Sequence, residues 1–243
     1  MKIASKLLSV VTVCLNDNDL LIKTIKSIRT QSFDDFEYII IDGGSSDATI
    51  QTINKNLDIV DLWISEKDNG IYDAFNKGIN LSKGKYIHLL NAGDIYFSKL
   101  SLSLLNFQSD YNFLCNSVLK KSSNDWVWLP RLNEKSNFVD VSHPGLIVKK
   151  SFYNKNKYST KYSFVSDNLF ISKHVNPKDT LISDQILVIM SDGGVSTKLS
   201  LKHELEKHKL LFYENYRQNE KLTLHFKYIF FFFINFFKKI LKV

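Results

Sequence analysis

The first ninety residues alternate short apolar runs with helix-like segments, and this alternation constrains the fold more than any other feature of the chain. The runs cover residues 7–15, 36–41, 60–65 and 86–90, and most of them are rich in the β-branched and aromatic side chains that are typical of buried strands. Strands that alternate with helices are joined by right-handed crossovers into a parallel sheet. The sequence therefore predicts an α/β fold with a doubly wound, mostly parallel sheet.

A carboxylate follows each of the last three runs. Asp42 comes directly after the second run, Asp68 lies in the loop after the third, and Asp94 ends the loop of residues 91–94 after the fourth. The carboxyl ends of parallel strands open onto one crevice, where α/β proteins bind their ligands. Because carboxylates there can also hold a divalent cation, this ordered set predicts a nucleotide-plus-metal site.

The connecting segments carry helix signals. Asp17 or Asn18 can cap the first helix, and Gly70 opens the third. Asp47 lies in a Gly-Ser turn before the second helix, where helix capping is favoured over contact with a ligand.

The second half of the chain is less regular. Strands are expected at residues 112–119, 126–129, 145–148 and 180–190, and a helix at 164–173. Further helices are expected at 199–216 and 222–241.

The composition is that of a globular protein large enough to bury a sizeable core. The 243 residues are 44% hydrophobic and 23% charged, and only three prolines and nine glycines leave little room for long linkers. Cys14 and Cys115 give no disulfide framework, which fits a reducing, cytoplasmic setting. Residues 7–15 follow two lysines as in a signal peptide, but their β-branched content and the absence of a clear cleavage site favour a first strand.

Positive charge is concentrated at the C-terminal end. The net charge is +7, and residues 198–243 hold ten Lys/Arg against four Asp/Glu, or +6, which leaves +1 for the rest of the chain. A nucleic-acid binder would carry its basic patch on the main domain, so that function is disfavoured. The Phe-rich residues 228–237 are too few to span a bilayer, and an in-plane anchor on anionic headgroups is the favoured interpretation. A buried terminal helix or a dimer contact is the alternative.

Short motifs in order along the chain carry a family resemblance. They are Val11-Thr12-Val13, Asp42-Gly43-Gly44-Ser45-Ser46-Asp47, residues 65–74, Asn76-Lys77-Gly78 and Leu90-Asn91-Ala92-Gly93-Asp94. With them the chain resembles the family 2 glycosyltransferases, which have the GT-A fold, over residues 8–94 and more loosely over 143–196. The Gly-Ile-Tyr-Asp-Ala stretch is similar to the subgroup that builds bacterial surface polysaccharides of the colanic acid, O-antigen and capsule types.

The resemblance implies a division of the chain. Residues 1–197 would form the GT-A domain, with a nucleotide-sugar-binding half at 1–97 and an acceptor and catalytic half at 98–197. Residues 198–243 would form a basic, Phe-rich helical extension.

The resemblance also implies roles for residues of the first half. Asp94 would hold Mg²⁺ or Mn²⁺, and the donor would be bound by Thr12, Asn16, Asp42, Gly44, Asp68, Asn76, Asn91, Ala92 and Gly93. Many relatives carry Asp at positions 91 and 93, so this chain departs from the pattern. Weak metal affinity, with the ion arriving on the nucleotide sugar, is the resulting hypothesis.

Inverting transfer also needs a general base from the second half. Asp167 matches the family's base position near the start of a helix, and Asp184 is a rival that instead looks structural. His143 and Trp126 are candidates for the acceptor side. Residues 193–196 resemble a late family motif, a loop that would fold over the site.

We therefore expect a cytoplasmic enzyme, peripheral on the inner face of the cell membrane, that moves a sugar to a lipid-linked saccharide. A UDP-sugar is the first donor to consider and a GDP-sugar the second, and homo-oligomers are compatible with the sequence. A sugar nucleotidyltransferase would need a Gly-rich loop after the first strand, which residues 15–18 lack. A membrane-bound scaffold with a decayed site is the non-enzymatic alternative. The uncharged Asn91 and Gly93, where many relatives carry Asp, favour it.

Overall fold

The computed structural model describes residues 6–108, 110–133, 137–191, 203, 205 and 206. Its core is a nine-stranded sheet with the strand order β3-β2-β1-β4-β10-β6-β11-β5, and β7 pairs with β6 beside this path. The strands are β1 Leu8–Cys14, β2 Phe36–Asp42, β3 Leu62–Ser65, β4 Tyr86–Leu89, β5 Ile95–Tyr96, β6 Phe113–Lys121, β7 Trp126–Trp128, β10 Leu146–Lys149 and β11 Thr180–Ser191. A separate hairpin pairs β8 (Arg131–Asn133) with β9 (Phe138–Asp140).

The helices are α1 Asn18–Arg29, α2 Thr49–Asn54, α3 Ile71–Leu81, α4 Lys150–Tyr153 and α5 Ser166–His174, with 3₁₀ turns η1 at His143–Gly145 and η2 at Pro177–Asp179.

The strands of the first half form the predicted parallel sheet. β1 lies between β2 and β4 and is parallel to both, and β2 is also parallel to β3. The second half makes the sheet mixed, because β10 is antiparallel to both β4 and β6, while β11 is parallel to β6. Since β10 runs backwards, its N-terminal end and the preceding η1 lie beside the carboxyl end of β4.

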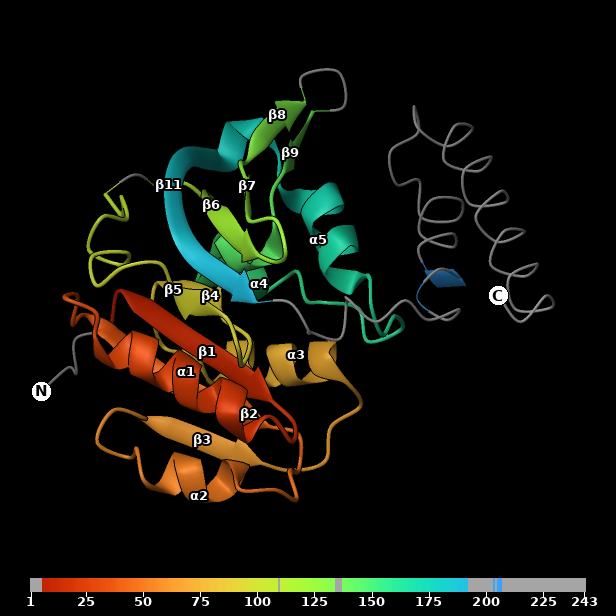
Figure 1. The fold of residues 1–243 in the computed structure, drawn as a ribbon. Helices are drawn as coiled ribbons and strands as arrows, with labels where there is room; N and C mark the ends of the chain where they lie inside the picture. Colours follow the sequence, from red (N-terminus) through yellow and green to blue (C-terminus); the bar gives the residue numbers. More distant parts are fainter. Residues whose placement is uncertain (1–5, 109, 134–136, 192–202, 204, 207–243) are drawn as a thin grey trace, which may run out of the picture.

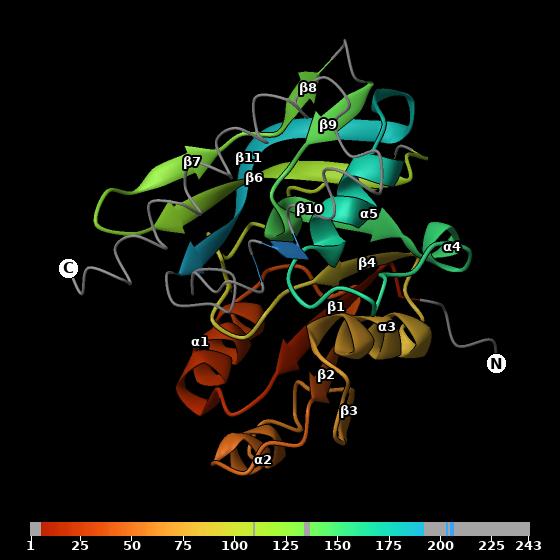
Figure 2. The same ribbon diagram turned by 90° about the vertical axis from the view of Figure 1, so that its right-hand side faces the viewer.

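Alternate side chains of the buried strands face two different helical layers. Val11 and Ile39 pack in one cluster with Phe75 of α3, whereas Val10 and Ile40 pack in the other with α1 and α2. Figures 1 and 2 show the sheet between these layers, with α5 above α3 on the same side of the molecule. The continuous apolar character of these strands follows from burial on both faces.

Gly78 sets the distance between α3 and the sheet. A Cβ atom at this position would lie 2.3 Å from Cγ1 of Val11, a contact that no side chain tolerates. Glycine therefore allows α3 to lie directly on β1, and this close packing fixes where the first turn of α3 begins.

His88 joins β4 to the segments beside it. Its ring is fully buried, Nε2 donates to the carbonyl oxygen of Pro144 at 2.9 Å, and Nδ1 accepts from the hydroxyl of Tyr96 at 2.9 Å. Burial lowers the pKa of His88 to about 4. The neutral imidazole thus holds η1 against the end of β4.

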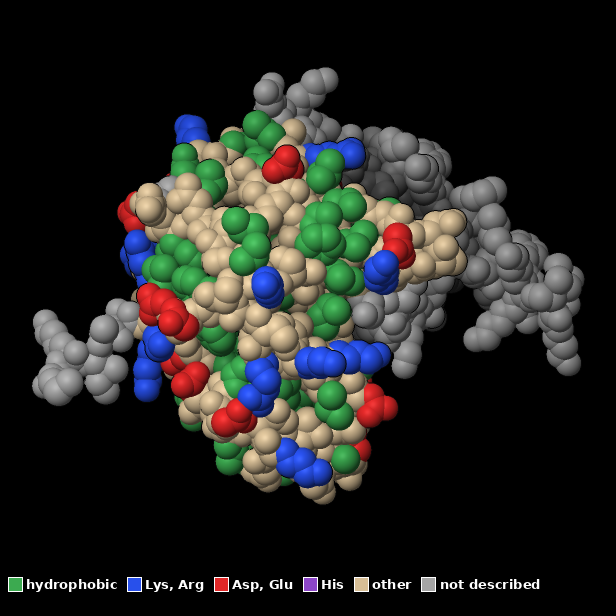
Figure 3. All heavy atoms as spheres, turned by 60° about the vertical axis from the view of Figure 1, so that its left-hand side comes forward, with side chains coloured by type: hydrophobic (Ala, Val, Ile, Leu, Met, Phe, Trp, Pro, Cys, Tyr) green, Lys and Arg blue, Asp and Glu red, His purple; other side chains and the backbone are tan. Residues whose placement is uncertain are grey.

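The surface carries exposed hydrophobic side chains in several places rather than in one. Phe97, Leu100 and Leu104 are exposed near β5, and Figure 3, which brings the left side of Figure 1 forward, shows separate hydrophobic groups with charged side chains between them. No helix among the described residues is both long and apolar enough to cross a membrane.

The sequence predictions can be compared element by element. The predicted strands at 36–41, 112–119, 126–129, 145–148 and 180–190 are confirmed within two residues, and Cys14 and Cys115 are buried and free. The hairpin β8–β9 and the short β5 were not predicted. The expected loop at 193–196, the helix at 222–241 and most of the helix at 199–216 lie outside the described residues.

Candidate functional site

Asp42 ends β2, and its carboxylate shapes the turn that follows. Oδ2 accepts from the backbone N–H of Gly44 at 3.1 Å and of Ser45 at 2.9 Å, and from the hydroxyl of Ser65 at 2.6 Å. Oδ1 accepts from the hydroxyl of Ser45. The side chain is fully buried, so its oxygens are engaged in positioning the turn at the edge of the sheet.

The loop after β3 packs on this turn. A Cβ atom on Gly43 would lie 2.6 Å from Oδ2 of Asp68, so the Asp68 carboxylate rests directly on the glycine. Oδ1 of Asp68 accepts from the N–H of Gly70 at 2.9 Å, just before α3. Gly44 has a φ of +89° and lies against the backbone of Lys67. The expected proximity of Asp42 and Asp68 follows from these contacts.

Asn16 ties the loop after β1 to the same turn. Its Oδ1 accepts from the N–H of Ser46 at 2.8 Å, and its own N–H donates to the hydroxyl of Ser45 at 2.7 Å. The residue is exposed and has a φ of +53°, a left-handed conformation that asparagine tolerates. Three strand-end loops thus meet at one edge of the sheet.

Asp47 acts as a helix-capping residue, as the sequence indicated. Oδ1 accepts from the N–H of Thr49 at 3.0 Å, in the first turn of α2, and Oδ2 accepts from the N–H of Asn18 at 3.3 Å, in the first turn of α1.

Thr12, for which contact with the nucleotide stays a prediction, is fully buried within β1. Its Oγ1 accepts from the hydroxyl of Tyr38 at 3.1 Å. This contact satisfies the hydroxyl inside the sheet.

The loop of residues 91–94 follows β4 and is held by α1. The hydroxyl of Thr24 accepts from the N–H of Gly93 at 2.9 Å and donates to the carbonyl oxygen of Asp94 at 2.8 Å. Gly93 has a φ of +98°, which favours glycine strongly. The N–H of Ala92 donates to the carbonyl oxygen of Val13 at 3.2 Å, which seats the loop on β1.

Asp94 and Asn91 place two oxygen-bearing groups in this loop. Burial raises the pKa of Asp94 to about 7, and hydrogen bonding from Asn91 acts in the opposite direction. The Oδ1 atom of Asn91 is buried and has no hydrogen-bond partner in the structure. A carboxylate beside an orphaned amide oxygen fits a hard cation such as Mg²⁺ or Mn²⁺. Within the described ranges no three His, Cys, Asp or Glu side chains converge, so protein carboxylates alone do not form a complete coordination shell.

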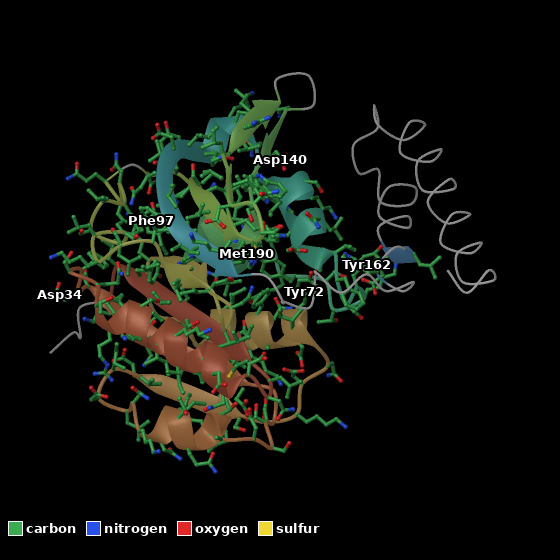
Figure 4. All side chains as sticks on the ribbon, in the orientation of Figure 1. Asp34, Tyr72, Phe97, Asp140, Tyr162 and Met190 are labelled. Atoms are coloured by element: carbon green, nitrogen blue, oxygen red, sulfur yellow. The ribbon has the colours of Figure 1, made fainter. Side chains whose placement is uncertain are left out.

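Asp167 lies in the first turn of α5 and is half-buried. The hydroxyl of Tyr72, in the first turn of α3, donates to its Oδ1 at 2.8 Å across a separation of 95 residues. Figure 4 labels Tyr72 at the junction between α3 and α5. The rival carboxylate Asp184 is exposed in the irregular middle of β11, and we assign it no site role.

His143 and Asn76 are built into the packing around Asp167. The His143 ring stacks on Phe75 at 5.0 Å, and its Nε2 lies 3.2 Å from the hydroxyl of Tyr158. Burial lowers the pKa of His143, while the nearby Asp167 carboxylate opposes this shift. The Asn76 amide donates to the Tyr158 carbonyl oxygen at 2.9 Å and accepts from the Tyr158 N–H at 3.0 Å, and its contact with the donor stays a prediction.

Trp126 lies on β7, which pairs with the C-terminal part of β6. Its side chain is 43% exposed, and its ring centroid is 5.5 Å from that of Trp128. The exposed Trp126 indole, beside the half-buried Trp128, offers an apolar surface of the kind on which a sugar ring can stack.

Three side chains with clear roles were missed by the sequence reasoning. Tyr72 lies in a quoted motif but received no role, because a contact across 95 residues leaves no local signal. Thr24 looks like an ordinary position on the buried face of a helix. Glu206 is a third case: its buried carboxylate accepts from the N–H of Ser163 and of Phe164, at 2.8–3.0 Å, just before α5.

Residues 9–178 match the family described as glycosyl transferase family 2. The chain belongs to this glycosyltransferase family. An uncharacterized glycosyltransferase of Mycobacterium tuberculosis is 39% identical over 87 residues, which cover 35% of this chain and 33% of that protein. A PGL/p-HBAD biosynthesis glycosyltransferase of Mycobacterium bovis is 26% identical over 222 residues, covering 84% of each. The alignment thus spans a third of the first relative and most of the second.

Solved glycosyltransferase structures share the α/β, GT-A-like fold with its mixed, mostly parallel sheet. TarS 1–349 of S. aureus in complex with UDP-GlcNAc has a TM-score of 0.68 at 16% identity, over 84% of this chain and 65% of that one. The mannosyltransferase PcManGT of Pyrobaculum calidifontis, in complex with GDP-Man and Mn²⁺, has a TM-score of 0.57 at 11% identity, over 85% and 61%. At these identities the likeness concerns the fold.

Proposed function

We propose that this family 2 glycosyltransferase transfers a sugar, with inversion, from a nucleoside diphosphate donor to a hydroxyl of a lipid-linked saccharide. One observation carries the proposal. The buried Asp94 carboxylate lies beside the orphaned Asn91 oxygen at the end of β4, and a second carboxylate, Asp167, is held at α5 by a side chain of the donor half.

The donor nucleotide would bind where the loops after β1, β2 and β3 meet. Asn16 and Asp68 line this edge with polar atoms, and Asp42 gives the turn its shape. Gly44, Ala92 and Gly93 would let the donor approach the backbone. UDP is the first choice of nucleotide and GDP the second, since the related structures hold UDP-GlcNAc or GDP-Man.

Asn91 and Asp94 would hold a divalent cation, Mg²⁺ or Mn²⁺. When bound, the ion would supply positive charge against the oxygens of the leaving diphosphate. The protein's own contribution is the rigid loop in which Thr24 fixes the backbone of Gly93 and Asp94. Because the described part of the chain supplies few metal ligands, we expect the ion to bind weakly without the nucleotide.

Asp167 would act as the general base. Its carboxylate takes the proton of the attacking hydroxyl while that oxygen bonds to the anomeric carbon and the bond from this carbon to the diphosphate breaks. Trp126 and His143 belong to the acceptor half, with Trp126 as the exposed stacking surface and His143 as a packing residue near Asp167.

The proposed acceptor and cellular location rest on the charge of the C-terminal residues and on the name of one relative. A glycolipid or surface-polysaccharide intermediate at the inner face of the membrane fits the basic residues 198–243, and one relative is named for PGL/p-HBAD biosynthesis. In this proposal residues 1–97 receive the donor, residues 98–197 receive the acceptor, and residues 198–243 associate with the membrane or with a second copy of the chain.

Nucleotide release from a donor panel tests the function. UDP-GlcNAc, UDP-glucose, UDP-galactose and GDP-Man are incubated with full-length protein and Mn²⁺, with and without alkyl glycosides as acceptor probes. We expect release of one nucleotide, increased by an acceptor and reduced about a hundredfold or more in Asp167→Asn. Folded protein that releases no nucleotide from any donor would favour the decayed scaffold instead.

A further inference from the structure

We propose that Tyr72 is a positioning residue for Asp167 and links the donor-binding loop to the base. The inference rests on the proposed function, because it takes Asp167 as the base. Tyr72 belongs to the Gly-Ile-Tyr-Asp-Ala stretch, and the donor-binding and metal-binding roles proposed above do not include it.

The hydrogen bond between the two side chains is well suited to fixing a carboxylate. The Tyr72 hydroxyl donates to Oδ1 of Asp167 at 2.8 Å, within the range of strong charge-assisted bonds. Tyr72 is 5% exposed, so water competes poorly for this contact. With Oδ1 engaged, Oδ2 is the oxygen oriented to accept a proton from the acceptor.

The ring of Tyr72 is itself held in place. It stacks on Tyr158 with a centroid distance of 5.9 Å and an angle of 19°, and it meets the edge of Phe75 at 5.9 Å and 67°. Asn76, one turn further along α3, forms two hydrogen bonds with the backbone of Tyr158. The direction of the hydroxyl is therefore set by packing before any substrate arrives, which is the condition for preorganisation.

Burial and the Asp167 carboxylate both raise the pKa of Tyr72 above its usual value. The hydroxyl thus keeps its proton and remains a donor.

The position of Tyr72 along the chain connects the two half-sites. Asp68 rests on Gly43 and accepts from the N–H of Gly70, and α3 begins at the next residue. Tyr72 is the second residue of that helix. In Figure 2, α3 lies below α5. When a donor contacts the loop of Asp68, any displacement of that loop would therefore reach Asp167 through the first turn of α3.

Tyr72→Phe tests the inference, because it removes the hydroxyl and keeps the ring that packs on Tyr158 and Phe75. Tyr86→Phe is the matched control, since Tyr86 is also buried and donates to the Tyr111 carbonyl oxygen at 3.3 Å, at the start of β4. For the donor that the panel identifies, we expect Tyr72→Phe to lower kcat about tenfold. We expect the KM for that donor and the Kd for its nucleotide with Mn²⁺ to stay within twofold of wild type.

Equal kcat values for wild type, Tyr72→Phe and Tyr86→Phe would overturn the inference, and so would a Tyr72→Phe loss that appears only in donor KM. A second readout needs no turnover: urea unfolding of Tyr72→Phe, of Asp167→Ala, which removes the accepting oxygen, and of the double variant. We expect the double variant's midpoint to lie above the value that adding the two single shifts gives, and strict additivity would refute the link. If wild type transfers no sugar, the proposed function fails. The unfolding midpoints of the three variants then decide alone whether the Tyr72 and Asp167 side chains are coupled.

Discussion

The hydroxyl of Thr24 on α1 accepts from the N–H of Gly93 and donates to the carbonyl oxygen of Asp94, at 2.9 and 2.8 Å. One short side chain thus satisfies two backbone groups of the loop that carries the candidate metal ligands. Its position explains how a loop containing a glycine with a φ of +98° is held in one conformation.

Thr24→Val should loosen this loop while preserving side-chain volume. We expect the free energy of unfolding to fall by about 1–3 kcal/mol, because the Gly93 N–H and the Asp94 carbonyl oxygen both lose their hydrogen bonds to the Thr24 hydroxyl. UDP binding in the presence of Mn²⁺ should weaken by roughly tenfold, since a loop that must be ordered on binding costs affinity. Thr24→Ser keeps the hydroxyl and should behave nearly as wild type in both urea unfolding and calorimetry. Wild-type nucleotide binding by Thr24→Val would show that the loop needs no such support.

Asp42→Asn should destabilise the turn after β2. An amide NH₂ replaces one carboxylate oxygen, so at least one of the donors on Gly44, Ser45 and Ser65 loses its acceptor. We expect a loss of about 2 kcal/mol in urea unfolding, together with weaker UDP binding. Ser65→Ala removes a single one of these bonds and should have the smaller effect on both. If Asp42→Asn loses UDP binding at unchanged stability, direct contact with the base is the better explanation.

The stability of the protein should depend on pH through His88. The folded pKa of about 4 lies below the ordinary value of 6.5, so between these values the unfolded chain binds a proton that folded His88 does not. The His88 contribution is thus fully present above pH 6.5, falls as the pH decreases through the window, and is lost below about pH 4. At 1.36 kcal/mol per pKa unit this amounts to about 3 kcal/mol.

Chemical denaturation at several pH values between 4 and 7 measures this dependence, with His88→Gln as the comparison. The difference between the two unfolding curves isolates His88 from other titrating groups. We expect the difference in unfolding free energy to shrink toward pH 4. A difference that stays constant across the window would contradict the assigned neutral imidazole.

Glu206 should matter for transfer more than for donor binding. Its carboxylate accepts from the N–H groups of Ser163 and Phe164, directly before the helix that presents Asp167. Glu206→Ala leaves these donors without the carboxylate, and we expect kcat to fall several-fold, with nucleotide affinity in calorimetry within twofold of wild type. Glu206→Gln retains one accepting oxygen, so its kcat should lie between those of wild type and Glu206→Ala. Parallel losses in kcat and nucleotide affinity would instead indicate a general loss of structure.

Much of the fold was predictable because its signals are local. β2 was predicted within two residues because its apolar run is continuous, and β11 because apolar residues lie on both sides of its polar residues 183–185. The short strands β5, β8 and β9 were missed, because two or three residues carry no periodic pattern. The contact of Asp47 with the start of α2 was predicted, since Thr49 is two residues away, whereas its contact with Asn18 at the start of α1 was not.

The site was predictable only in part. The strand-end order brought Asp42, Asp68 and the loop ending in Asp94 to one edge, as parallel topology requires. The complete burial of Thr12 was not foreseen, because no local pattern shows that the Tyr38 hydroxyl of the neighbouring strand contacts its side chain. The contact of Tyr72 with Asp167 depends on how two helices from different halves pack, which no single segment encodes.

Calorimetric titration of UDP and of GDP into full-length protein, with and without Mn²⁺, tests the central claim most directly, because that claim is a donor site at the carboxyl edge of the sheet. We predict that one of the two nucleotides binds in the presence of Mn²⁺, that the metal alone binds at least tenfold more weakly, and that Asp94→Asn abolishes the metal-dependent part. Nucleotide binding of equal strength with and without Mn²⁺, unchanged in Asp94→Asn, would contradict the role assigned to this loop. Absence of binding by folded protein would contradict the donor site as a whole.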